Sequence, residues 1–301
     1  MVLAMSFDMF MQHLLNGISL GSLYALIAIG YTMVYGILRL INFAHGDIFM
    51  VAAYFAFYGV SLFSMPWYIA FVAAIIMTGL LGIVIEIAAY RPIRNAPKIS
   101  ILISAIGVSF FLENLGTVIF GGVPKAFPQV DLFTEVIQIG NVSLQRLTII
   151  IPIVTLLLLF GLLYLVNKTK SGMAMRAVSK DHETASLMGV NINKIISLTF
   201  ALGSILAAVG GIMWGLKFPQ IAPLMGIMPG LKCFIAAVIG GIGDIKGAVL
   251  GGFILGVGEI MLVAFLPSLS GYRDAFAFIL LILILLFKPT GIMGEKIAEK
   301  V

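Results

Sequence analysis

Two glutamates fall inside long apolar stretches of the sequence. Glu113 lies within the stretch 99–120, with Asn114 beside it, and Glu259 lies near the middle of 247–266. A charged group deep in a membrane is costly unless it is partnered, so such residues are candidates for ion coupling or for a transport pathway. A hydrogen-bonded contact between helices explains each of them equally well. In either case we expect both glutamates to face the interior of a helix bundle.

Asn42 and His45 lie between the first two apolar stretches and are further pathway candidates. The simpler interpretation of His45 is a loop residue that orders its own segment. The three histidines, His13, His45 and His182, share no metal-ligand spacing, and Cys233 is the single cysteine. Neither a metal site nor an internal disulfide is therefore predicted.

No catalytic motif accompanies these polar residues. The sequence contains no Gly-x4-Gly-Lys-Ser/Thr phosphate-binding loop, no nucleophile elbow and no His-Glu-x-x-His. We therefore expect a chain that binds no cofactor and does not hydrolyse ATP itself.

The longest polar stretch predicted inside the cell is 168–194, and it contains a short helix signal. Ser179 or Asp181 can cap a helix start by accepting a backbone N–H, and the charge of Glu183 suits that positive end. Gly189 can end the helix, because glycine adopts the left-handed conformation readily. The pattern predicts a helix of roughly nine residues, about 13 Å long.

That helix would carry a small apolar face. Ala185 and Met188 are three residues apart, and Leu187 lies between them. A helix lying flat on lipid headgroups would have a longer apolar stripe with Phe, Trp or Leu. We therefore favour a docking element for another protein over an interfacial helix.

The composition determines what must position these residues. Of 301 residues, 61% are hydrophobic and only 10% are charged, whereas a soluble domain has about 25% charged residues. No long polar stretch could form a second domain. The net charge of +5 is explained by Lys and Arg residues in cytoplasmic loops, so it does not indicate a nucleic-acid-binding protein. We predict one all-α polytopic membrane domain over 1–301.

Eight apolar stretches are long enough to cross a membrane, which takes about 20 helical residues. They are 14–36, 47–64, 67–90, 99–120, 147–167, 195–217, 247–266 and 272–288. A shorter apolar piece, 231–243, is a candidate for a partial ninth helix, so eight to nine helices are expected in all. The glycines at 240, 241 and 243 suggest a broken helix near 231–266, although a tight turn between two helices explains them equally well.

Positive residues predict the orientation, because Lys and Arg gather in cytoplasmic loops. The loops 91–98 and 168–194 are both basic and are separated by two spans, so they face the same side. This places the N-terminus outside and the C-terminus in the cytoplasm. Thirteen of the 18 Lys and Arg residues then lie inside, including Lys296 and Lys300.

Small residues recur four apart and predict close helix packing. The main pairs are Gly17 with Gly21, Gly211 with Gly215, and Gly247 with Gly251. They could pack within this chain or against a second subunit. The stretches 17–30, 203–215 and 240–258 are our candidates for the pathway.

Several motifs resemble one known family. Gly17-Ile-Ser-Leu-Gly21-Ser-Leu-Tyr24, Ile41-Asn42-Phe43-Ala44-His45-Gly46-Asp47, Tyr90-Arg91-Pro92-Ile93-Arg94, Ala185-Ser186-Leu187-Met188-Gly189 and Pro289-Thr290-Gly291-Ile292 run in order along the chain. Together they resemble the LivH-type permeases of branched-chain amino acid ABC importers. Glu183 to Gly189 also resembles the Glu-Ala-Ala-x3-Gly segment by which ABC permeases engage their ATPases, although Thr184 replaces the first alanine and the Ile-x-Leu-Pro tail is absent.

The resemblance implies a function and a set of partners. Such permeases pair with a second, related permease, dock two cytoplasmic ATPases that bind ATP and Mg²⁺, and receive an amino acid from an extracytoplasmic binding protein. It implies a place in a bacterial-type inner membrane and a coupling element from Arg176 to Gly189, with Asp181 and Glu183 as cap or polar rim. Permeases for urea and short amides carry similar motifs and remain an alternative substrate class. An ion-coupled secondary transporter that uses Glu113 and Glu259 is the alternative mechanism.

Overall fold

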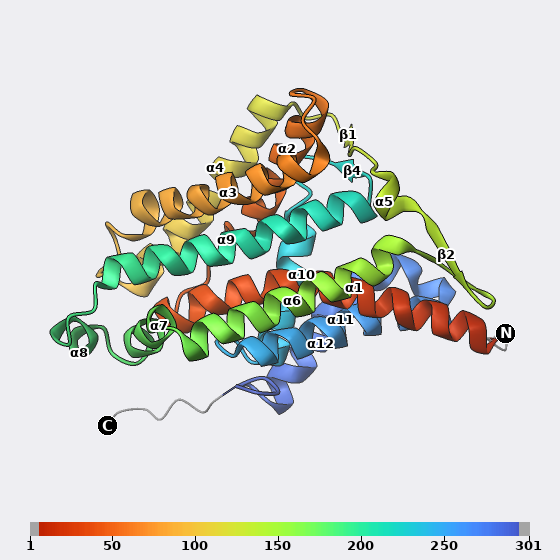
Figure 1. Ribbon diagram of the computed structural model, residues 1–301. Coiled ribbons are helices and arrows are strands. Elements are labelled where there is room, and N and C mark those ends of the chain that lie inside the picture. Colours follow the sequence, from red (N-terminus) through yellow and green to blue (C-terminus); the bar gives the residue numbers. More distant parts are fainter. Residues whose placement is uncertain (1–5, 295–301) are drawn as a thin grey trace.

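The computed structural model describes residues 6–294, which form a single bundle of helices (Figure 1). The main helices of the bundle are α1 (Phe7–Leu38), α2 (His45–Ser61), α3 (Trp67–Ile85), α4 (Lys98–Phe120), α6 (Arg146–Lys168), α9 (Ile192–Lys217), α10 (Ile227–Gly240), α11 (Ile245–Phe265) and α12 (Arg273–Phe287). A π-helical turn, Glu86–Tyr90, extends α3, and a 3-10 segment, Pro267–Tyr272, precedes α12. The predicted all-α membrane fold is confirmed.

Seven of these helical segments are long and apolar enough to cross a membrane. The other two are α2, with 17 residues, and α10, with 14. Each corresponds to an apolar stretch of the sequence, 47–64 for α2 and 231–243 for α10. The predicted eight to nine helices are therefore found. Helix α10 is a partial span, as expected, whereas α2 is shorter than the full span predicted for 47–64.

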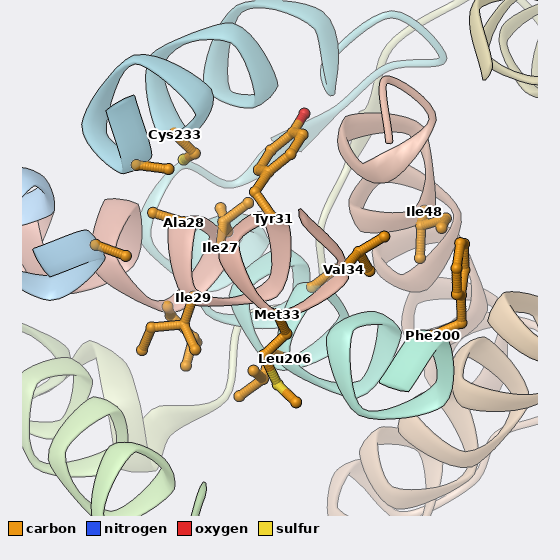
Figure 2. Packing of buried hydrophobic residues seen from close by; sticks show 14 of the residues in the cluster. Ile27, Ala28, Ile29, Tyr31, Met33, Val34, Ile48, Phe200, Leu206 and Cys233 are labelled. Carbon is orange, nitrogen blue, oxygen red and sulfur yellow. The ribbon is translucent and has the colours of Figure 1, made fainter. Parts of the chain in front are cut away.

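Helix α1 is the centre of the bundle. In its most apolar window, 94% of the residues are buried within the chain, and it packs along α11, α9, α10 and α6. Figure 2 draws part of this core, with side chains leaving α1 in several directions toward the surrounding helices. A helix that is apolar on all sides is expected in such a position.

The small residues predicted to permit close packing do so within this chain. A Cβ at Gly21 would lie 2.9 Å from the Phe253 backbone of α11, and one at Gly17 would lie 3.0 Å from Val257. Gly211 packs on the Phe49 carbonyl of α2, Gly215 on the Phe127 ring, and Gly247 and Gly251 on the backbone of α10. Of the two interpretations, packing within the chain accounts for all six glycines. The three pathway stretches lie in these same helix contacts.

The short helices α2 and α10 both begin inside the bundle. The first residue of α2, His45, lies against Gly30, which is eight residues or about 12 Å from the end of α1 at Leu38. Gly46 in the first turn of α2 contacts Gly226 and Gly230 at the start of α10. The N-termini of the two helices therefore meet at a buried point, which the sequence did not indicate.

The glycines at 240–243 form a tight turn between α10 and α11, one of the two predicted alternatives. Gly241 and Gly243 take φ values of 112° and 102°, a region that favours glycine. The Asp244 carboxylate then caps α11 by accepting from the Gly247 N–H at 2.6 Å. Helices α10 and α11 run antiparallel from this turn, with the backbone of Gly240 against that of Gly247.

Short strands and helices close the two ends of the bundle. The pairs β1 (Lys125–Ala126) with β4 (Gln220–Ile221) and β2 (Val136–Ile139) with β3 (Val142–Gln145) are antiparallel, and α5 (Asp131–Thr134) lies between them in sequence. None of these elements was predicted. We call this the strand end; it also holds the start of α1 (Figure 1).

The opposite end, the α8 end, carries α7 (Lys170–Lys180) and α8 (His182–Leu187) (Figure 1). The two basic loops share this end, since the 91–97 segment contacts α9 through Arg91 and Ser197 at 2.8 Å. The side of the membrane that the α8 end faces stays a prediction. Lys296 and Lys300 lie outside the described residues.

Candidate functional site

The predicted coupling loop, 168–194, folds as two helices where one was expected. Helix α7 begins at the Thr169 cap, whose hydroxyl accepts from the Gly172 N–H at 3.1 Å. Met175 and Val178 are buried and hold α7 against the bundle. Apolar residues three apart on one helix face could have revealed α7, but the polar composition of the loop concealed it.

Helix α8 is capped by Asp181, one of the two predicted caps. The Asp181 carboxylate accepts from the backbone N–H groups of Glu183 at 2.9 Å and Thr184 at 3.1 Å. The other candidate, Ser179, lies in α7 and donates to the Arg176 carbonyl at 2.8 Å. Gly189 follows the helix with φ +83°, the left-handed conformation expected of it.

The apolar face of α8 differs from the prediction. Helix α8 has six residues rather than about nine. Ala185 is only 3% exposed, because it packs into the bundle, whereas Leu187 and Met188 are 88% and 81% exposed. Ala185 and Met188 therefore share no surface, and the exposed apolar pair is Leu187 with Met188.

Arg176 lies apart from that exposed pair. Its guanidinium contacts the Val166 carbonyl at the end of α6. It also lines a cavity of about 120 Å³ between α1, α6, α7 and the α10–α11 turn. The assignment of Arg176 to the coupling element stays a prediction.

An ion pair fixes the neighbouring loop at the α8 end. Arg91 donates to both oxygens of Glu86, at 3.1 and 2.7 Å, and the Ser197 hydroxyl donates to Glu86 at 2.7 Å. The hydrogen bond to Glu86 raises the pKa of Arg91. Burial and the nearby charge of Arg94 lower the pKa of His182 at the start of α8. The 91–97 loop and α8 are therefore close enough to interact electrostatically.

Glu259 faces the interior, as predicted, and it belongs to a charged cluster. Its side chain is fully buried, and its carboxylate lies 2.8 Å from the Lys232 ammonium and 3.6 Å from the Arg273 guanidinium. The Tyr24 hydroxyl donates to it at 3.1 Å. Lys232 also pairs with Asp274 at 2.7 Å. The cluster joins α1, α10, α11 and α12.

Glu113 and Asn114 are less buried than Glu259. Glu113 is half-buried and Asn114 is exposed on α4. The Asn114 amide donates to the Phe110 carbonyl of its own helix at 2.7 Å. The carboxylate of Glu113 also interacts electrostatically with the buried Asp47 of α2. Glu113 therefore lies at the edge of the face by which α4 packs on the bundle, less buried than predicted.

Asn42 and His45 are buried at the start of α2. The Asn42 side-chain oxygen Oδ1 accepts from the Tyr90 hydroxyl at 2.8 Å. The His45 ring lies 4.5 Å from the Tyr31 ring, and its Nε2 has no hydrogen-bond partner. The residues form part of the bundle interior, so the interpretation of His45 as a loop residue is wrong. Across residues 6–294, no group of three or more His, Cys, Asp or Glu side chains could hold a metal ion.

Sequence reasoning missed Lys232, Asp274 and Tyr24 as the partners of Glu259. Lys232 was a visible signal, because it interrupts an apolar piece of the sequence. A single buried charge in a membrane protein calls for a partner of opposite sign. The three-dimensional pairing of α10 with α11 was needed to show which residue that was.

Comparison with known proteins gives a consistent result. The family model described as branched-chain amino acid transport system / permease component matches residues 13–285. The high-affinity branched-chain amino acid transport system permease protein BraD of Pseudomonas aeruginosa is 44% identical over 97% of this chain and 98% of its own length. The permease protein LivH of Escherichia coli K12, of the same description, is 43% identical over the same shares of both chains. A probable branched-chain amino acid transport permease of Methanocaldococcus jannaschii is 29% identical over 91% of this chain and 89% of its own length.

Proposed function

The chain belongs to the family of branched-chain amino acid transport permeases, and we propose that it is the membrane-spanning permease subunit of an ABC importer for these amino acids. The observation that carries the proposal is 44% identity to a high-affinity permease over 97% of the chain. A bundle with seven helices able to span a membrane suits that role. Substrates of this kind have an apolar side chain, and the bundle interior is correspondingly apolar.

The partners follow from the same proposal. The chain supplies half of the translocation pathway, and a second, related permease supplies the other half. Two cytoplasmic ATPases bind and hydrolyse ATP with Mg²⁺, and an extracytoplasmic binding protein delivers the amino acid. In this arrangement the α8 end faces the cytoplasm, in agreement with its basic loops.

The coupling element in this proposal is the exposed edge of α8. Leu187 and Met188 supply the apolar contact with an ATPase, and Asp181 and Glu183 supply the cap and polar rim. Exposed apolar side chains on a short helix outside the membrane are unfavourable in water, so a protein partner that covers them gains stability. Ala185 fixes α8 to the bundle, so that movement of α8 reaches α9 and α7.

A charge on the coupling edge tests this assignment. Met188→Asp should abolish ATP-dependent uptake and reduce co-purification of the ATPases, while the amount of inserted protein is unchanged because the side chain is 81% exposed. Met9→Asp is the matched control, since Met9 is 53% exposed at the strand end. Normal uptake by Met188→Asp would contradict the assignment of α8.

The mechanism of energy coupling separates this proposal from an ion-coupled transporter. Glu259 is ion-paired with Lys232 and Arg273, an arrangement that favours a structural role in holding α10, α11 and α12 together over ion coupling. Leucine uptake in cells should therefore continue when the proton and sodium gradients are dissipated and stop when ATP is depleted. Uptake that stops on dissipating the gradients while ATP is maintained would contradict an ABC importer.

A further inference from the structure

We propose that the outward face of α4 is the surface on which the second permease subunit docks. This inference rests on the proposed function and adds which face of the chain that subunit covers. The face is marked by Gly107, Phe110 and Asn114, which are all exposed. They are three and four residues apart and therefore lie on one side of the helix. We call it the 107–114 face.

Three other helices at the outside of the bundle have outward faces that suit lipid. Over residues 69–85 of α3, 153–161 of α6 and 275–287 of α12, every exposed residue is apolar or glycine. Lipid tails are as apolar as these side chains, so such a surface needs no protein to cover it.

Helix α4 differs, because polar groups reach its exposed side well inside the span. Asn114 is exposed and Glu113 is half-buried, and both lie roughly 9–10 Å before the end of the helix at Phe120. The Asn114 amide donates to the Phe110 carbonyl of its own helix. Within residues 6–294, Glu113 pairs with no Lys or Arg. A carboxylate and an amide in contact with hydrocarbon are unfavourable unless they are partnered.

These polar groups continue a line of polar side chains that begins inside the bundle. Asp47, in the first turn of α2, is 3% exposed and accepts from the Ser109 hydroxyl of α4 at 2.5 Å. Its carboxylate interacts electrostatically with Glu113, and Asn114 follows on the exposed side. The line therefore runs from the buried start of α2 to the 107–114 face. Polar groups of another protein can cover its outer end, whereas lipid tails cannot hydrogen-bond to it.

The depth of the face within the span selects the class of partner. In the proposed importer, the ATPases and the binding protein meet the two ends of the bundle, so neither covers the side of α4. The second permease is the subunit that is itself embedded in the membrane. Gly107 suits its approach, because nothing lies within 4 Å of the position of a Cβ there. Residues without a large side chain let membrane helices pack closely.

Photo-crosslinking from two matched positions tests the face. Benzoylphenylalanine replaces either Phe110 of α4 or Phe160 of α6, which are 60% and 64% exposed, in the complete transporter in lipid nanodiscs. Irradiation should join position 110 to a second permease subunit, identified by mass spectrometry, whereas position 160 should give lipid adducts only. A permease adduct no more abundant at 110 than at 160, or lipid adducts alone at 110, would overturn the proposal even where the same preparation takes up leucine.

A bulky residue tests the same face without a probe. Gly107→Trp should abolish co-purification of the second permease and ATP-dependent leucine uptake, while this chain still inserts because the site is open. Gly161→Trp on α6 is the matched control and should retain both, since nothing lies within 4 Å of its Cβ either. Normal co-purification of the second permease with Gly107→Trp would overturn the docking face. Absence of leucine uptake by the wild-type transporter would instead overturn the proposed function.

Replacement of the exposed amide distinguishes a protein-covered face from a lipid-covered one. Asn114→Leu should lower recovery of the second permease about threefold, the effect of losing one hydrogen bond between membrane helices. A lipid-covered surface would tolerate the same change, because leucine is as apolar as lipid tails. Unchanged recovery with Asn114→Leu would therefore contradict the polar contact on which the proposal depends.

Discussion

The buried pair of Lys232 and Glu259 allows a quantitative prediction. Lys232→Met removes the nearest cation from a carboxylate that is 0% exposed. Removal of one partner from a buried ion pair costs about 3–5 kcal/mol, because the remaining charge stays buried. Since the Arg273 guanidinium remains 3.6 Å away and the Tyr24 hydroxyl 3.1 Å away, we expect the lower end, about 3 kcal/mol. That loss corresponds to a fall in Tm of roughly 6–12 °C.

The assay is thermal unfolding in lipid nanodiscs, followed by tryptophan fluorescence. The double variant Lys232→Met with Glu259→Gln should recover most of the lost stability, to within about 1 kcal/mol, because no unpaired buried charge remains. Arg146→Met is the control: its pair with Glu135 is partly exposed and contributes about 0–1 kcal/mol. A Lys232→Met variant as stable as wild type, or a double variant no more stable than the single one, would refute the reasoning.

Three further predictions concern packing and the α8 end. Gly211→Ala should destabilise by about 1–3 kcal/mol because its Cβ meets a backbone carbonyl of α2, whereas Gly161→Ala should be neutral or slightly stabilising; thermal unfolding compares the two. Gly189→Ala should speed amide exchange in α8, since φ +83° disfavours any side chain; unchanged exchange would contradict this. The pKa of His182 is lowered in the fold, so its contribution to the free energy of unfolding should be fully present above about pH 6.5 and be lost as the pH falls through the lowered pKa. His182→Gln should weaken this pH dependence, measured as the Tm.

The positions of the helices could be predicted from the sequence because lipid imposes long apolar segments. The stretch 231–243 was recognised as a helix, but its start inside the bundle depends on contacts of Gly226 and Gly230 with Gly46. Contacts between residues far apart in sequence leave no periodic pattern. For the same reason the strands at 125–126 and 220–221, which pair with each other, were not anticipated.

The functional residues were predicted in part. Asp181 and Gly189 were identified correctly as the start and end signals of α8, because capping and positive φ are local properties. When a helix is apolar on every side, its own sequence does not show which face packs on the bundle, so the direction of a given side chain depends on contacts with distant segments. Glu113 was therefore placed in the interior although it is half-buried, and the shared face of Ala185 and Met188 was wrong. The proposed roles of these residues in coupling and in the pathway stay predictions.

Transport by a purified system tests the central claim most directly. Proteoliposomes that contain this chain with its co-purifying subunits, a binding protein and ATP should accumulate radiolabelled leucine. Unlabelled isoleucine and valine should compete with the uptake, whereas urea should not, and vesicles without this chain should accumulate none. Accumulation of urea or an amide in place of leucine, or equal leucine uptake without this chain, would contradict the account.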